Sequence, residues 1–99
     1  MSLTGKQKRH LRSLAHHLNP IFQVGKGGVN LNMTKQIADA LEARELLKVQ
    51  ILQNALEDKE EIAQQLVEGT GAELVQIIGN VIVLYKESRE NKEIELPRG

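Results

Sequence analysis

Residues 21–32 read Ile-Phe-Gln-Val-Gly-Lys-Gly-Gly-Val-Asn-Leu-Asn, and the interpretation of the whole chain starts from this stretch. Its first four residues form a short apolar run typical of a strand, and an amphipathic segment follows the turn. Glycines lack a Cβ, so another backbone can approach closely, and their N–H groups can point at an anion beside the positive end of the next helix. The turn fits the pattern Gly-x-x-Gly and consists of Gly25, Lys26, Gly27 and Gly28.

The length and composition indicate one small soluble domain. The chain has 99 residues, of which 40% are hydrophobic and 26% are charged. It contains no cysteine, which excludes disulfides, thiolate zinc sites and a cysteine nucleophile. We find no apolar run of the ~18 residues needed to span a bilayer and no apolar signal-peptide core at the N-terminus. We therefore expect a cytoplasmic protein that does not bind membranes.

The formal net charge of zero conceals an asymmetry between the two halves of the chain. Residues 1–50 hold eight basic and three acidic side chains, a net charge of +5, and residues 51–99 hold five basic and ten acidic ones, a net charge of −5. Such a split predicts one surface suited to a polyanion and another that repels it. The alternative is that the two halves pair with each other within the fold.

Before the glycine turn, a first helix is predicted from an N-cap at Thr4 to about His17. It ends before Pro20 because the residue that precedes a proline avoids the α region. The basic side chains of this helix are expected on the side away from the core, except that Lys8 is expected nearer the edge of the helix's apolar stripe. The apolar positions, expected to form one stripe against the core, are Leu11, Leu14, Ala15 and Leu18.

After the turn, the chain predicts two more helices and three more strands. Asn30 or Asn32 is expected to cap the second helix. Asp58 and Glu61 are expected to form a capping box for the third. Two apolar runs joined by Gly79-Asn80 are a strong hairpin signal. The predicted elements are a helix to about residue 44, a strand over 46–52, a helix that glycines 69 and 71 stop, and strands over 74–78 and 81–85.

The element order is therefore α-β-α-β-α-β-β. Crossovers through helices make the first three strands parallel and place their helices on one face, and the hairpin makes the fourth strand antiparallel to the third. The prediction is a two-layer α/β sandwich with a mixed four-stranded sheet and helices on one face, spanning residues 1–87. Residues 88–99 are polar and are expected to form a flexible, frayed tail.

Several segments resemble the CRM domain family in one register over roughly residues 2–87. The spacing is similar to that of the bacterial single-domain members, the YhbY-like and YqeI-like proteins. Agreement of several motifs in order is more specific than a lone Gly-x-x-Gly, which is also a common strand-to-helix turn. The segments are TGKQKRHLRSLAHHLNP (4–20), QVGKGG (23–28), ARELLKV (43–49) and GNVIVLYK (79–86).

The resemblance implies a fold similar to the C-terminal domain of bacterial translation initiation factor three. That fold is usually described as βαβαββ, here with an added N-terminal helix, and has the sheet order 1-2-4-3. The resemblance also implies RNA binding. Bacterial single-domain members associate with precursors of the large ribosomal subunit, and plant relatives act in organelle intron splicing. Ribosomal RNA in pre-large-subunit particles is therefore the implied partner.

The glycine turn and its basic neighbours are the candidate RNA-binding site. The backbone amides of Gly25, Gly27 and Gly28 would hold phosphates together with the Lys26 ammonium. Arg44 could instead pair with Glu45 or another acid. The cations that could extend the site along the first helix and its flank are Lys6, Lys8, Arg9, Arg12, Arg44 and Lys48.

Other residues give no prediction of catalysis. The histidines at 10, 16 and 17 lack the i, i+4 spacing of metal ligands, so we expect surface imidazoles or phosphate hydrogen-bond donors. The carboxylates of residues 57–61 are explained by the helix dipole and capping. The glycine turn lacks the Gly-Lys-Ser/Thr of a P-loop. We expect no enzyme activity, metal, cofactor or small-molecule substrate.

Only two aromatic residues are present, Phe22, expected in the core, and Tyr85 at a strand end, which could be buried or exposed. Proteins that bind single strands through aromatic stacking usually have more. The composition thus favours contacts with RNA backbone and shape over the reading of individual bases.

Two hypotheses from different classes follow. The first is a non-catalytic, monomeric RNA-binding protein that acts in ribosome assembly. The second is a protein–protein adaptor that works through the acidic half around the third helix. Partners that stay bound after ribonuclease treatment of a lysate would favour the adaptor.

Overall fold

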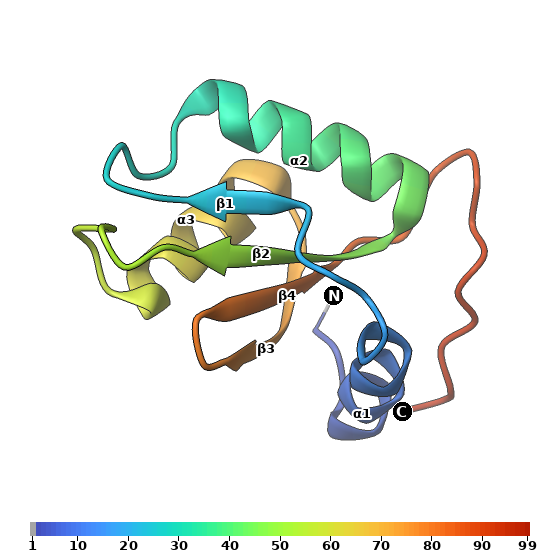
Figure 1. The fold of residues 1–99 in the computed structure, drawn as a ribbon. Helices are drawn as coiled ribbons and strands as arrows, with labels where there is room; N and C mark the ends of the chain where they lie inside the picture. Colours follow the sequence, from blue (N-terminus) through green and yellow to red (C-terminus); the bar gives the residue numbers. More distant parts are fainter. Residues whose placement is uncertain (1) are drawn as a thin grey trace.

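Seven elements follow one another in the predicted order. The computed structural model describes residues 2–99, and Figure 1 shows their arrangement. The elements are α1 (Gly5–Ala15), β1 (Phe22–Val24), α2 (Leu31–Arg44), β2 (Leu46–Ile51), α3 (Lys59–Thr70), β3 (Glu73–Ile78) and β4 (Val81–Tyr85).

The helix starts test the predicted caps. Thr4 forms a capping box with Gln7, in which the Gln7 N–H donates to Thr4 Oγ1 at 3.1 Å and the Thr4 N–H donates to Gln7 Oε1 at 3.0 Å. Asn30 is the N-cap of α2, where its Oδ1 accepts the Met33 N–H at 2.8 Å. Asp58 occupies the N-cap position of α3, but its side chain accepts no cap hydrogen bond. The predicted capping box with Glu61 is therefore wrong, because both exposed carboxylates stay in water.

The four strands form one mixed sheet in the order β1-β2-β4-β3 (Figure 1). Strand β1 runs parallel to β2, and β4 is antiparallel to both β2 and β3. This arrangement confirms the mixed four-stranded α/β fold and the strand order that the family resemblance implied.

Helices α2 and α3 cover one face of the sheet, as the right-handed crossover rule predicts. Phe22 packs half-buried against the core between these layers, which confirms its predicted core position. The largest fully buried side chains of this core are Val24, Ile37, Leu41, Leu47, Val49, Ile62, Leu66, Ile82 and Leu84.

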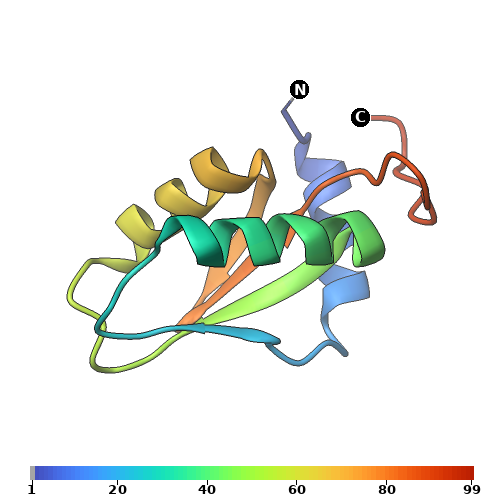
Figure 2. The ribbon, with the colours of Figure 1, turned by 90° about the horizontal axis from the view of Figure 1, so that it is seen from above.

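The first helix lies on the opposite face, so the prediction that all helices share one face is wrong for α1. Figure 2 shows the β3–β4 hairpin between α3 on one side and α1 on the other. The handedness rule applies to connections between parallel strands, and α1 precedes the first strand. It instead covers a second apolar cluster on the sheet, formed by Leu11, Ala15, Leu46, Val75, Val83 and Tyr85.

The buried stripe of α1 is narrower than its sequence pattern predicts. Leu11 and Ala15 are buried, but Leu14 is 41% exposed and Leu18, beyond the end of the helix, is 37% exposed. Helix α1 crosses only part of the sheet face, so only one side of the predicted stripe finds a partner.

Residues 87–99, here termed the C-terminal strap, contain no helix or strand but lie against the domain (Figure 1). Ile94 and Leu96 pack against the apolar cluster beneath α1. The Gln7 side chain of α1 donates to the Pro97 carbonyl at 3.1 Å. The structure thus places a bound segment where the polar composition predicted a frayed tail, because two apolar side chains and the segment's own N–H groups make the contacts.

Glu42, near the end of α2, binds the beginning of the strap. Its carboxylate accepts the Arg89 and Glu90 N–H groups at 3.0 Å each and the Ser88 hydroxyl at 2.7 Å. The Arg89 N–H, followed by the Ser88 hydroxyl and the Glu90 N–H, lowers the pKa of Glu42 from 4.5 to about 2.

Glu45, directly after α2, binds the strap from a buried position. Its carboxylate accepts the N–H groups of Ser88, Glu93 and Ile94, each at 2.8 Å. Burial alone would raise the pKa of Glu45, but these three N–H groups outweigh it and the pKa is lowered. The backbone of Glu45 has φ of 66°, an unusual value for a residue with a Cβ.

Candidate nucleic-acid interface

The glycine turn is closed by one internal hydrogen bond, and its other three N–H groups, of Gly25, Lys26 and Gly27, have no partner among the described residues. The Gly28 N–H donates to the Gly25 carbonyl at 3.0 Å, and Gly28 has φ of 68°, which favours glycine. The Lys26 side chain is exposed. The turn can therefore offer three backbone donors and one ammonium group to an anion.

One side of the glycine turn packs against the loop between β2 and α3, which lies at the same end of the molecule in Figure 1. A Cβ added at Gly25 would lie 3.1 Å from Asn54 Oδ1, and one added at Gly28 would lie 3.3 Å from Glu57 Oε1. A Cβ at Gly27 would meet nothing within 4 Å. Because Glu57 repels anions, a phosphate would approach from the open side at Gly27.

Helix α1, which carries four of the predicted basic residues, lies away from this turn, toward the opposite end of the sheet (Figure 1). Lys6 and Arg9 are exposed, and Lys8 and Arg12 are half-buried. The structure therefore does not gather all the predicted site residues into one cluster.

Arg44 is also separated from the glycine turn. It is exposed in the last turn of α2, whose 14 residues extend for about 20 Å, whereas the glycine turn precedes the first turn of that helix. The predicted alternative, an ion pair of Arg44 with Glu45 or another acid, is not formed within residues 2–99, and the Glu45 carboxylate binds the strap instead.

Lys48 and Arg12 do come together. Both line a small groove of about 70 Å³ between α1 and the sheet, together with His16. The Lys48 ammonium donates to the Leu18 carbonyl at 2.9 Å, which holds it at this position. The groove thus gathers two permanent cations and one imidazole on the sheet face that α1 shares.

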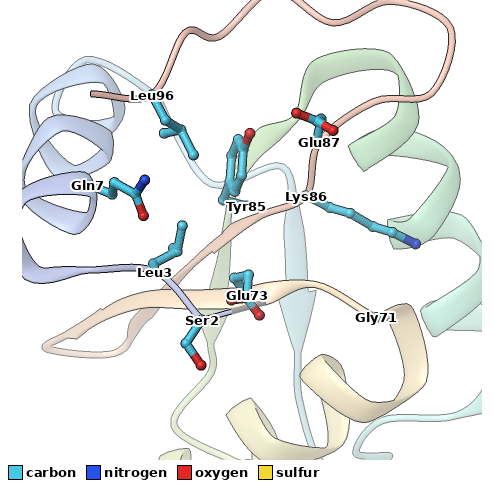
Figure 3. A pocket seen from close by; sticks show the side chains of 9 residues that line it. All are labelled: Ser2, Leu3, Gln7, Gly71, Glu73, Tyr85, Lys86, Glu87 and Leu96. Carbon is cyan, nitrogen blue, oxygen red and sulfur yellow. The ribbon is translucent and has the colours of Figure 1, made fainter. Parts of the chain in front are cut away.

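A larger hollow of about 340 Å³ lies at the strap, shown in Figure 3. The Tyr85 hydroxyl is buried there with no hydrogen-bond partner among the described residues. Burial, followed by the charges of Glu45 and Glu87, raises the pKa of Tyr85 to about 12. Glu73 and Glu87 also line the hollow, so it does not extend the basic surface.

The histidines form no metal site in the described part of the chain. The rings of His16 and His17 meet edge to face with centroids 5.1 Å apart. Among residues 2–99, no group of three or more His, Asp or Glu side chains is placed to hold a metal ion. In the same residues, no helix combines the length and apolar character that crossing a membrane requires.

Comparison with known proteins assigns the chain to one family. The family model of the CRS1 / YhbY (CRM) domain matches residues 3–86. The chain belongs to the CRM domain family. This membership agrees with the segments that carried the resemblance in the sequence.

Relatives of this CRM domain include proteins named for RNA binding. The chain is 74% identical over 95 residues to the "Probable RNA-binding protein YqeI" of Bacillus subtilis, covering 96% of this chain and 99% of the relative. It is 42% identical over 97 residues to an "RNA-binding protein" of Haemophilus influenzae, covering 98% and 97%. The solution structure of SAV1595 from Staphylococcus aureus matches with a TM-score of 0.80 and 67% identity, covering 96% of this chain and 99% of that one.

The sequence did not reveal that the CRM domain leaves part of a sheet face open beside the cations of α1. In the sequence, Leu47, Val49 and Ile51 alternate with Lys48 and Gln50, which is typical of a sheet with one polar face, but no local signal places α1 on that face. This alternation, which the structure shows as buried and half-buried side chains along β2, is the sequence signal that could have predicted this surface.

Proposed function

We propose that this CRM domain is a non-catalytic RNA-binding protein that acts in assembly of the large ribosomal subunit, with precursor ribosomal RNA as its ligand. The observation that carries the proposal is the glycine turn, whose Lys26 and Gly27 N–H groups have no acceptor in residues 2–99 and lie beside an exposed ammonium. Relatives named as RNA-binding proteins support the ligand class. The ribosomal role is supported by the family resemblance.

The RNA would contact two places on the domain. One is the glycine turn, where backbone donors and Lys26 bind phosphates. The other is the groove at α1, where Arg12 and Lys48 lie together. Since the two places are at different ends of the sheet, one RNA segment that reaches both must cross the domain.

The test measures affinity for a precursor ribosomal RNA fragment as salt is varied. If about five phosphates are neutralised, log affinity falls against log salt with a slope of roughly −3.5 to −4.5. The variant Lys26→Ala/Arg12→Ala should weaken binding to all RNA sequences and make this slope shallower by about 2. The matched control Lys35→Ala/Arg89→Ala removes the same two charge types from exposed positions elsewhere on the domain.

Equal affinities for the two double variants would contradict the assignment of the binding residues. The ribosomal role needs a separate experiment, in which the protein is cross-linked to RNA in cells and the attached fragments are sequenced. Fragments of pre-large-subunit RNA are expected. Protein partners that survive ribonuclease, with no RNA fragment enriched, would favour the adaptor hypothesis.

A further inference from the structure

The sheet face shared with α1 is only half covered. Helix α1 lies near the beginning of β2, whereas the glycine turn and the β3–β4 turn lie at the other end of the strands (Figure 1). Beneath α1, Leu46, Val75 and Tyr85 are buried. Beyond α1, Gln23 is exposed and Ile78 is 55% exposed. The uncovered part is here termed the open sheet face.

The strand register orders the open sheet face into two rows. In the row next to the glycine turn, Gln23 is opposite Gln50, Gln50 is opposite Val81, and Val81 is opposite Ile78. The second row, at the edge of α1, runs from Lys48 to Gln76, both half-buried, with Val83 between them buried in the cluster beneath α1. Neither row contains a carboxylate.

Both ends of this surface carry cations. Arg12 and His16 of α1 line the groove that also holds Lys48, Gln76 and Ile78. Lys26 stands in the turn that follows β1, two residues after Val24 and three after Gln23. A polyanion that reaches from the α1 groove to the glycine turn therefore lies over the glutamines.

The three glutamines have free amide groups. None of the side chains of Gln23, Gln50 and Gln76 makes a hydrogen bond to another group within residues 2–99. A primary amide offers two donor hydrogens and an acceptor oxygen in one plane, which matches the edge of a nucleobase. In duplex RNA the deep, narrow groove hides most base edges, whereas unpaired bases present them.

We propose that the open sheet face is a base-reading surface, on which the Gln23, Gln50 and Gln76 amides bind edges of unpaired bases while the glycine turn and the α1 groove hold the flanking phosphates. The ligand class is single-stranded RNA, and the domain discriminates between base sequences. This inference rests on the proposed RNA-binding function and deepens it. It also revises the expectation, drawn from the scarcity of aromatic residues, that individual bases are not read.

The first experiment maps the position of the RNA. The variant Gln23→Glu/Gln50→Glu keeps the side-chain shape and adds two negative charges to the open sheet face. Its matched control, Gln36→Glu/Gln64→Glu, adds the same charges at exposed positions of α2 and α3. We expect the affinity for single-stranded RNA to fall at least tenfold more in the first variant than in the control.

The second experiment tests base reading. Affinities of the wild type, Gln23→Ala/Gln50→Ala and the control Gln36→Ala/Gln64→Ala are measured for a panel of single-stranded RNA 12-mers and for a duplex of the same length. The wild type should prefer single strands and should discriminate among the 12-mers. The Gln23→Ala/Gln50→Ala variant should reduce the ratio of best to worst affinity about tenfold, the lower range for loss of a bidentate amide contact. Its salt dependence should stay unchanged.

The outcomes separate this inference from the proposed function. Wild-type affinities equal for all 12-mers and for the duplex, or equal effects of the open-face and control variants, would overturn base reading while RNA binding itself stands. Absence of any salt-dependent RNA affinity in the wild type would instead remove the proposed function. Circular dichroism of each variant verifies that the fold is intact.

Discussion

Helix α2 has backbone N–H groups of other segments at both of its ends. The glycine turn supplies them at its beginning, and the C-terminal strap supplies them at its end. At the strap, five N–H groups and one hydroxyl bind the carboxylates of Glu42 and Glu45. At the turn, the Lys26 and Gly27 N–H groups have no acceptor within residues 2–99. The same donor chemistry therefore builds a structural contact where the chain supplies its own anion, and leaves a binding site where it does not.

The largest effect is expected from removing a carboxylate that binds the strap at the end of α2. Glu45→Ala removes the acceptor of three N–H groups around a buried position, so we expect the free energy of unfolding to fall by about 3 kcal/mol. Urea denaturation measures this loss. Glu68→Ala, at an exposed position of α3, is the control and should change stability by less than about 0.5 kcal/mol. Equal losses in the two variants would show that the strap adds no stability.

The next largest effect is the release of the strap at low pH, when the Glu42 carboxylate is protonated. The folded-state pKa of Glu42, about 2, lies below the ordinary value of 4.5, so the ionised carboxylate favours the folded state. The stabilisation is complete above about pH 4.5 and is lost as the pH falls toward 2. NMR shifts of the Arg89 and Glu90 amides should report release over this range. In Glu42→Gln the corresponding change should disappear, and a change of unaltered size would assign the transition to another group.

A smaller effect is expected at the glycine turn, where the N–H groups have no acceptor within residues 2–99. Gly27→Ala introduces a Cβ that meets nothing within 4 Å and does not stand at positive φ, so stability should not change. If a phosphate lies against this backbone, the added methyl group interferes with about one charge-assisted hydrogen bond, and RNA affinity should fall roughly tenfold. Fluorescence anisotropy with labelled RNA measures the affinity. Unchanged affinity would place the RNA away from the turn.

The smallest expected effect concerns the tyrosine beneath the strap. The Tyr85 hydroxyl is buried without a partner among the described residues, so Tyr85→Phe removes a group that gains nothing from burial. We expect the free energy of unfolding to stay constant or to rise by less than about 1 kcal/mol in urea denaturation. A loss larger than that would mean that the hydroxyl contributes to holding the strap, in addition to the two glutamates.

The turn and the strap also differ in how well the sequence predicts them. The element order, the Asn30 cap and the Gly79-Asn80 hairpin follow from local signals, because glycine, asparagine and strand alternation act within a few residues. The strap could not be predicted, because its contacts join residues 88–94 to glutamates more than forty positions earlier. The position of α1 had the same difficulty, since no local signal selects a sheet face.

The candidate site was predictable residue by residue but not as an arrangement. The pattern Gly-x-x-Gly marked the turn, and the basic residues of α1 could be read directly from the sequence. Their separation at two ends of the sheet depends on the placement of α1, and so does the uncovered surface between them on which Gln23 and Gln50 lie. The pairing register of the strands brings these residues, which are distant in the sequence, side by side on one surface, and the register cannot be read from the sequence.

The placement of α1 also affects how the domain is made. The ribosome releases α1 first, but the apolar side chains of Leu11 and Ala15 pack on β3, β4 and the strap, which emerge late. Contacts between such distant segments slow folding, and unpartnered apolar surface is prone to misassembly. During synthesis, the apolar side of α1 therefore lacks these packing partners until residues 73–96 have left the exit tunnel.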